Sequence, residues 1–312
     1  MRAAPGLVHA DSTRPGLRRA RTRAGFRYRD ASGARVVDAA TLARIEAIVI
    51  PPAWTDVWIC PDPRGHVQAT GRDARGRKQY RYHAEWSRRR SDDKYARLAL
   101  VGRALPRLRR RVTRDLASRG VPRRKALALV VRLIETACVR VGNEEYAREN
   151  GSRGLTTLLD GHARDAGAGV RLVFRGKSGV RHDVAITDRR VARLVRKCRE
   201  LPGQQLFQYV DERGRVRDVT SDDVNRYIRE AADADLTAKD FRTWSGTCLA
   251  AEALLKRGAA SRRVEVAVVK EVASRLGNRP ATCRKHYIHP LVFEAHASGA
   301  LARAAELARS RR

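Results

Sequence analysis

The chain has 312 residues and carries 66 Lys and Arg against 34 Asp and Glu, a formal net charge of +32. Its apolar content of 43% is sufficient for hydrophobic cores in about two domains. The charge indicates a polyanionic partner, because a bias toward arginine codons would not by itself suppress the acidic residues. A membrane protein is not expected, since no apolar run approaches the roughly 18 residues of a transmembrane helix.

The cysteines and the N-terminal residues favour a reducing compartment. The five cysteines are odd in number, widely spaced and form no C-x-x-C pair, which is typical of reduced thiols. The N-terminal stretch contains "LRRARTR" and no apolar core of the kind that a secretory signal has. We therefore expect a cytoplasmic protein whose residues 1–24 form a disordered basic arm, with a transit peptide as the alternative.

Residues 25–90 show the pattern of a small antiparallel β domain. The expected strands are "GFRYRD", "DVWIC", "HVQAT" and "KQYRY", and one helix over residues 40–48 interrupts them. In the last strand Lys78, Tyr80 and Tyr82 alternate with Gln79 and Arg81. Aromatic and basic groups could there reach the sugar, phosphate and base edges of a nucleic acid. A structural pair of half-buried tyrosines is the alternative.

The remaining residues, 91–312, are predicted to be mainly helical. One helix over residues 123–141 has an apolar face and ends at Gly142. Arg140 falls in its last turn, where a cation commonly complements the helix dipole.

A β-hairpin is predicted next, with strands over residues 170–174 and 180–186 and Lys177 at the tip of "RGKSG". The "GKS" string is not a phosphate-binding loop. Arg171 stands where that motif has its first glycine, and a strand follows where it has a helix. Taken alone, an exposed lysine in a turn indicates only a solvated side chain.

A capped helix follows, with Thr237 and Asp240 marking its N-terminus and Gly258 its end. Lys239 and Arg242 lie on one face of its first turn. Free backbone N–H groups and the helix dipole favour an anion at that end, so a phosphate is expected there.

Two more helices complete this part of the chain. The first carries an apolar stripe and ends at Gly277 in a left-handed turn, which Asn278 follows. The second, a short helix, begins at Pro280 and is closed by Pro290, and Tyr287 lies near its end. A lone tyrosine in such a helix would ordinarily be a packing residue.

The stretches "KDFRTWSGT" and "LGNRPATCRKHYIHP" together strongly resemble the active-site half of type IB DNA topoisomerases, in the short form of bacteria and poxviruses. The segments "KQYRY" and "RVGNEEYARENGSRGLTTL" are similar to further parts of that family, and the resemblance covers residues 25–296. It implies that Tyr287 is the nucleophile, that Arg140, Arg242 and Asn278 stabilise the transition state, and that Lys177 is the general acid.

The resemblance also implies how DNA is held. Gln79, Tyr80 and Tyr82 would contact the major groove at the cleavage site, Tyr146 would be a further contact, and Lys239 remains the phosphate contact that its helix predicts. The expected partner is duplex DNA, clamped by a monomer associated with the nucleoid. The expected fold is α+β: a small N-terminal antiparallel β-sheet domain followed by a mainly α-helical catalytic domain that carries a β-hairpin.

The chemistry suits these residue types. Arginines offer forked pairs of donors to the charge that develops on a phosphate in the transition state. A tyrosine with a pKa near 10 is ionised to only about one part in a thousand at pH 7, so a positive cluster should help its proton to leave. Resealing is the reverse reaction, so we expect no ATP, metal or other cofactor. The His286 and His289 pair, adjacent on a short helix, is a weak candidate for a metal site.

Two departures from related patterns bear on the assignment. Poxvirus and eukaryotic members, and most tyrosine recombinases, have histidine where this chain has Asn278. Tyrosine recombinases usually also have histidine at the position of Lys239, which favours a topoisomerase. Three functions stay open at this point: a relaxing topoisomerase, a site-specific recombinase, and a non-catalytic basic protein that packs DNA.

Overall fold

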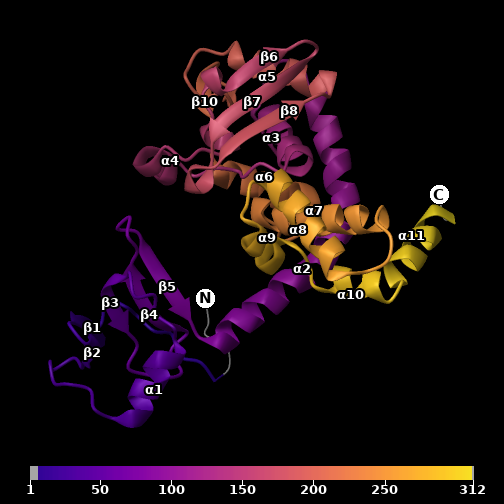
Figure 1. Cartoon of the computed structure of the whole chain (residues 1–312). Helices are drawn as coiled ribbons and strands as arrows, with labels where there is room; N and C mark the ends of the chain where they lie inside the picture. Colours follow the sequence, from indigo (N-terminus) through magenta and orange to yellow (C-terminus); the bar gives the residue numbers. More distant parts are fainter. Residues whose placement is uncertain (1–5, 311–312) are drawn as a thin grey trace. The chain divides into compact units, whose positions relative to one another are not determined.

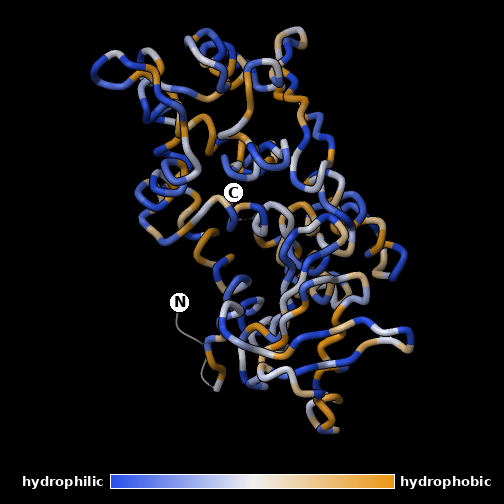
Figure 2. Tube along the Cα trace, turned by 90° about the vertical axis from the view of Figure 1, so that its left-hand side faces the viewer, coloured by the Kyte–Doolittle hydropathy of each residue, from blue (hydrophilic) through white to orange (hydrophobic). Residues whose placement is uncertain are grey.

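The structure, a computed structural model, describes residues 6–310. The chain divides into two compact units between Asp93 and Lys94 (Figure 1). The sequence places this boundary near residue 90, in the charged junction. Figure 2 shows hydrophobic residues spread along the chain. No helix in the described part of the chain is long and apolar enough to cross a membrane.

The first unit is a five-stranded antiparallel sheet in the order β2-β1-β3-β4-β5, with one helix (Figure 1). Its elements are β1 Leu17–Thr22, β2 Gly25–Arg29, α1 Ala39–Ala47, β3 Thr55–Ile59, β4 Val67–Arg72 and β5 Lys78–Tyr82. Asp38 caps α1 by accepting a hydrogen bond from the Thr41 backbone N–H at 2.7 Å. Ile45 of α1 packs into the core with Leu17, Val57 and Ile59 from the strands.

The prediction that residues 1–24 form a disordered arm is wrong for residues 17–22, which form strand β1. This strand pairs with β2 from Arg18 to Thr22 and with β3 at Leu17 and Arg18. Its arginines are not all solvated: the Arg19 guanidinium donates to the backbone carbonyls of Pro51 at 3.0 Å and Trp54 at 2.7 Å. Arg19 thereby ties β1 to the loop before β3, so this basic residue stabilises the fold of the first unit. Residues 1–5 of the predicted arm lie outside the described residues.

The second unit is mainly helical and has two small sheets. Helix α2 (Ala84–Leu116) begins in the first unit and continues into the second. The remaining helices are α3 Arg123–Ala137, α4 Glu144–Asn150, α5 Arg189–Arg199, α6 Ser221–Ala232, α7 Ala238–Leu255, α8 Arg262–Leu276, α9 Pro280–Tyr287, α10 Leu291–Ala297 and α11 Ala300–Ser310, with 3-10 turns η1 Leu155–Thr157, η2 Asp160–His162 and η3 Lys177–Gly179. The strands are β6 Ala163–Ala166, β7 Gly169–Arg175, β8 Arg181–Ile186, β9 Gln208–Val210 and β10 Val216–Asp218. The predicted fold class is confirmed.

Two hydrophobic cores hold this unit together. In the larger core α3 is buried on nearly all sides and packs against α5, α6 and α7. The smaller core lies among α7, α8 and α9, around Leu254, Val272, Leu276 and Cys283. Helix α7 contributes to both cores, so it is a fixed base for the residues it carries.

Helix α3 ends earlier than the sequence predicts. It stops at Ala137, because Cys138 adopts the left-handed conformation with φ 54°. The chain then runs extended, and the carbonyls of Arg140 and Val141 accept hydrogen bonds from the backbone N–H groups of Leu155 at 2.9 Å and Thr156 at 2.7 Å. Arg140 therefore follows the helix instead of lying in its last turn, and long-range backbone pairing holds it in place.

Candidate active site

Arg242 lies at the centre of the second unit, where it joins the ends of two helices. It projects from α7 and is only 4% exposed. Its guanidinium donates to the carbonyl of Cys138 at the end of α3 and, at 2.7 Å, to that of Leu276 at the end of α8. These carbonyls belong to the negative ends of the helix dipoles, so they help to hold a buried cation. Burial, and then repulsion by Arg140, lower the pKa of Arg242 to about 10, which leaves it charged at neutral pH.

The Arg140 guanidinium links Asn278 and Tyr287. Its Nη2 donates to the Asn278 side-chain oxygen at 3.0 Å and to the Tyr287 hydroxyl at 3.2 Å. The guanidinium carbons of Arg140 and Arg242 lie 5.8 and 5.2 Å from the centre of the Tyr287 ring. Four of the five residues predicted to carry the chemistry therefore form one cluster around Arg140 and Tyr287.

Asn278 is placed by the turn that ends α8. Gly277 has φ 61°, a left-handed conformation that favours glycine, and the Asn278 backbone N–H donates to the Ala273 carbonyl at 2.9 Å. The predicted left-handed stop is confirmed. This turn directs the Asn278 side chain toward Arg140.

Tyr287 lies at the C-terminal end of α9, and side chains of the neighbouring helix α2 hold that end in place. The Tyr95 hydroxyl donates to the carbonyls of Lys285 at 3.2 Å and Ile288 at 3.0 Å, and the Lys94 ammonium donates to that of His286 at 3.2 Å. The helix also lies very close to α7, where a methyl group on Gly246 would come within 2.4 Å of the Tyr287 carbonyl oxygen. Only glycine permits this approach, which accounts for the glycine in "TWSGT".

The electrostatics favour ionisation of Tyr287. Burial alone would raise its pKa, but the Arg140 and Arg242 cations outweigh burial and hold the pKa below its usual value of 10.0. A phenolate is the nucleophilic form of tyrosine, so the two arginines activate it.

Two buried donors in this cluster lack hydrogen-bond partners among the described residues: the Arg242 Nε and the Asn278 amide nitrogen. A buried donor without a partner costs about 1–3 kcal/mol, so such groups call for an explanation. Beside a tyrosine hydroxyl and two cations, an anion with several acceptor oxygens would satisfy both donors.

Lys177 occupies the predicted hairpin but is not part of this cluster. It begins the turn η3 between β7 and β8, where the Gly176 backbone N–H donates to the Val180 carbonyl at 2.8 Å. Its side chain is exposed and forms no hydrogen bond or ion pair with any other described residue. The lysine is free to contact a ligand that approaches the hairpin.

His182 is a site residue that the sequence analysis does not identify. It lies in β8, and burial together with the nearby Arg242 and Arg140 cations lowers its pKa. Its signal in the sequence is the strand alternation that puts His182, Val184 and Ile186 on the more buried face of β8.

Four of the five predicted DNA contacts are exposed, and Gln79 is the exception. In the first unit, Tyr80 and Tyr82 are 44% and 48% exposed, and their rings stack at 5.9 Å. Both rings are thus about half exposed, so the DNA contact and the structural pair both stay open. Gln79, on the other face of β5, donates to Asp73 at 3.0 Å. In the second unit, Tyr146 on α4 is 59% exposed. Lys239 is also exposed, so it does not share the buried environment of Arg242.

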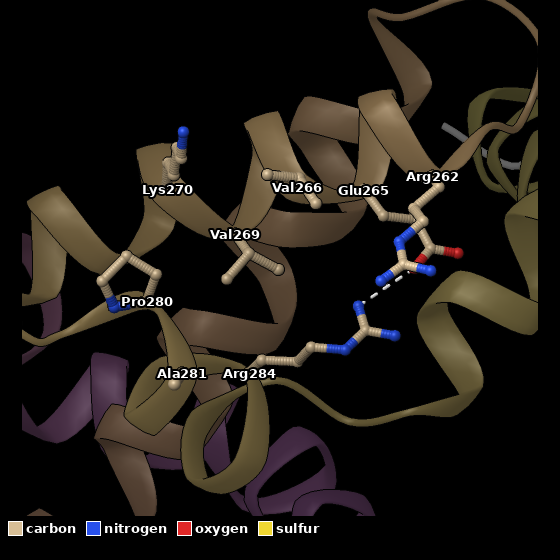
Figure 3. Close-up of a pocket in the computed structure, with 8 residues that line it drawn as sticks. All are labelled: Arg262, Glu265, Val266, Val269, Lys270, Pro280, Ala281 and Arg284. Atoms are coloured by element: carbon tan, nitrogen blue, oxygen red, sulfur yellow. Dashed lines mark ion pairs between the residues drawn. The ribbon is translucent and has the colours of Figure 1, made fainter.

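A separate groove of about 540 Å³ lies between α8 and α9 (Figure 3). Its lining includes Val266, Val269 and Pro280, and the Arg284–Glu265 ion pair at 3.0 Å crosses it. None of the predicted site residues lines it. Among residues 6–310, no group of three or more His, Cys, Asp or Glu side chains is arranged to hold a metal ion.

Comparisons with known proteins agree with this geometry. Residues 83–308 match the family profile described as eukaryotic DNA topoisomerase I, catalytic core. Residues 25–73 match the profile described as bacterial DNA topoisomerase IB, N-terminal domain. The chain is also 32% identical over 265 residues to DNA topoisomerase 1B of Acanthamoeba polyphaga mimivirus, which covers 81% of this chain and 79% of that protein.

Proposed function

Because this chain belongs to the type IB DNA topoisomerases, isomerases that act on DNA, we propose that it relaxes supercoils through a 3′-phosphotyrosyl intermediate formed by Tyr287. The observation that carries the proposal is the convergence of Arg140 and Arg242 on Tyr287, with Asn278 accepting a hydrogen bond from Arg140. The unpartnered donors of Arg242 and Asn278 support it, since phosphate oxygens would satisfy them.

In the proposed cleavage step, Tyr287 loses its hydroxyl proton to solvent and the phenolate oxygen forms a bond to phosphorus, while the bond from phosphorus to the 5′ oxygen breaks. The pentacoordinate transition state gathers negative charge on its non-bridging oxygens. Arg140 and Arg242 are charged and held in place before the reaction, so they stabilise that charge without reorganising. Arg140 also lies within hydrogen-bond distance of the attacking oxygen, at 3.2 Å.

The departing 5′ oxygen needs a proton, and we assign that proton to Lys177. An alkoxide is a poor leaving group, so a positioned acid accelerates its departure. Lys177 is the candidate because its side chain is exposed at a hairpin tip and is not engaged by other described residues. Returning the proton to Lys177 allows the 5′ hydroxyl to attack the phosphotyrosine and reseal the strand.

The proposed cycle consumes no nucleotide. The phosphotyrosyl bond replaces the phosphodiester, so the bond energy is kept while the free strand end rotates. We further propose that no metal ion is required, because the two arginine cations and the lysine supply the charge stabilisation and the proton. One chain is sufficient for this chemistry, since residues 94–310 contain the whole cluster. The clamp around duplex DNA and the location at the nucleoid remain predictions.

The proposal is tested by incubating the protein with supercoiled plasmid in EDTA and without ATP. We expect both negative and positive supercoils to relax. Strict dependence on ATP or on a divalent cation would contradict the cofactor-free cycle. Binding without any strand cleavage would indicate a DNA-packing protein, and joined products from paired sites would indicate a recombinase.

A further inference from the structure

The His182 imidazole fills a narrow space between two turns of the second unit. On one side it stacks on Phe174 of β7, with ring centres 4.8 Å apart and planes only 5° from parallel. Phe174 is itself buried in the larger core, so the stack fixes the plane of the imidazole. The ring forms no hydrogen bond with any described residue, so stacking and van der Waals packing alone hold it.

Two glycines allow the ring to sit there. A methyl group added to Gly277 would lie 2.3 Å from His182 Cε1, and one added to Gly176 would lie 2.6 Å from His182 Nε2. Both distances are far below a van der Waals contact, so the imidazole packs directly on the backbone at both positions. It is therefore in contact with two turns that are about 100 residues apart in the chain.

Each glycine precedes a residue of the proposed mechanism. Gly176 is followed by Lys177, the proposed acid, and Gly277 is followed by Asn278, which accepts a hydrogen bond from Arg140. A shift of the hairpin relative to the α8–α9 turn would move Lys177 away from the leaving oxygen. Such a shift would leave Arg140, Arg242 and Tyr287 in place, since helices α7 and α9 and the segment after α3 hold them.

We propose that His182 is a positioning residue that sets the Lys177 hairpin against the Gly277–Asn278 turn, so that the acid reaches the 5′ oxygen. This inference rests on the proposed function, and it predicts a defect limited to proton delivery. A residue that only stabilised the fold would affect every step of cleavage alike.

The test compares single-turnover cleavage of a normal phosphodiester with cleavage of a 5′-bridging phosphorothiolate, whose thiolate leaving group departs without a proton. His182→Ala should slow cleavage of the normal substrate by about 10- to 100-fold, because a displaced acid should lose only part of the roughly 10²- to 10⁴-fold that general acid catalysis contributes. The same variant should cleave the phosphorothiolate within about threefold of the parent protein and should bind DNA with unchanged affinity.

Three further variants make the result decisive. Phe174→Leu keeps an apolar core residue but removes the stack, so it should show a smaller defect with the same substrate dependence. His162→Ala is the matched control: this half-buried histidine accepts a hydrogen bond from the Leu159 backbone N–H at 2.9 Å, and its side chain forms no hydrogen bond with a described site residue. It should affect both substrates equally, through stability alone.

Lys177→Ala separates this inference from the proposed function. If the phosphorothiolate rescues Lys177→Ala but not His182→Ala, the acid assignment stands and the role of His182 is overturned. If neither variant is rescued, Lys177 is not the acid, and the inference fails together with that assignment. Cleavage of both substrates by His182→Ala at the parent rate would also overturn it.

Discussion

The residue on which the chemistry depends is Tyr287, and Tyr287→Phe removes only its phenolic oxygen. The ring that faces Arg140 and Arg242 is kept, so α9 should stay packed and DNA affinity should be unchanged. Covalent adduct and plasmid relaxation should vanish, because no nucleophile remains beside the two cations. Denaturing gels of the reaction with labelled DNA measure the adduct. A DNA 3′ end still attached to the Tyr287→Phe protein would disprove the assignment.

The pKa of Tyr287 gives a second prediction at the residue scale. Arg140 and Arg242 lower this pKa against the opposing effect of burial. Arg140→Ala should therefore raise the pKa and move the pH dependence of cleavage to higher pH. Below the pKa, the phenolate fraction grows about tenfold per pH unit. At neutral pH the variant should also lose about 10²- to 10³-fold in cleavage rate through the missing transition-state donor.

Single-turnover cleavage between pH 6 and pH 10 measures both effects. Arg140→Lys is the control, because it keeps a cation while losing the forked donor geometry. It should retain more of the low-pH activity than Arg140→Ala. Identical pH profiles for the parent protein and Arg140→Ala would show that Arg140 does not set the ionisation of Tyr287.

Among the helices and strands, the sequence predicts correctly those ends that local backbone preferences fix. Gly277 and Pro280 mark the end of α8 and the start of α9, and both assignments are confirmed because backbone conformation alone favours them. The end of α3 is missed, since Cys138 carries no such preference and pairing with Leu155 and Thr156 fixes the segment.

Strand β1 is missed for a related reason. Its sequence is dominated by arginines, which indicate exposure when only neighbours in the chain are considered. The strand forms because β2 and β3 pair with it and because Arg19 finds carbonyl acceptors in a distant loop. Strand alternation indicates the more buried face for His182, but its contacts with two turns far apart in sequence cannot be read from spacing.

The contact between α7 and α9 gives a prediction at this scale. Gly246→Ala would bring a methyl group within 2.4 Å of the Tyr287 carbonyl, so the end of α9 must shift. Alanine favours a helix over glycine by about 1 kcal/mol, which partly offsets the loss of stability. A displacement of about 1 Å at a reacting group can cost about 10²-fold in rate, so we expect cleavage to fall by that order with DNA affinity kept.

Gly258→Ala is the matched control for this prediction. A methyl group there would have no neighbour within 4 Å, so cleavage should be unchanged. The two variants are compared by single-turnover cleavage and by thermal unfolding. Parent-like cleavage by Gly246→Ala would show that the close approach of α7 does not position the nucleophile.

For the whole molecule, the net charge of +32 predicts that DNA binding is driven largely by the release of counterions from the DNA phosphates. Each phosphate neutralised by Lys or Arg contributes about −0.9 to the slope of log affinity against log salt. Affinity of the Tyr287→Phe protein for a duplex should therefore fall steeply between about 50 and 200 mM salt. Using this variant separates binding from covalent capture, and a flat response would remove the electrostatic basis of the DNA assignment.

The same titration distinguishes cations that contact DNA from cations engaged within the protein. Lys239 is exposed at the start of α7, so Lys239→Ala should reduce the magnitude of the slope by about one. Arg171 is engaged by Asp183 through two hydrogen bonds of 2.8 Å, and Arg171→Ala should leave the slope unchanged. Equal slopes for the parent protein and Lys239→Ala would mean that α7 does not present its first turn to a phosphate. Binding would then depend on other parts of the basic surface.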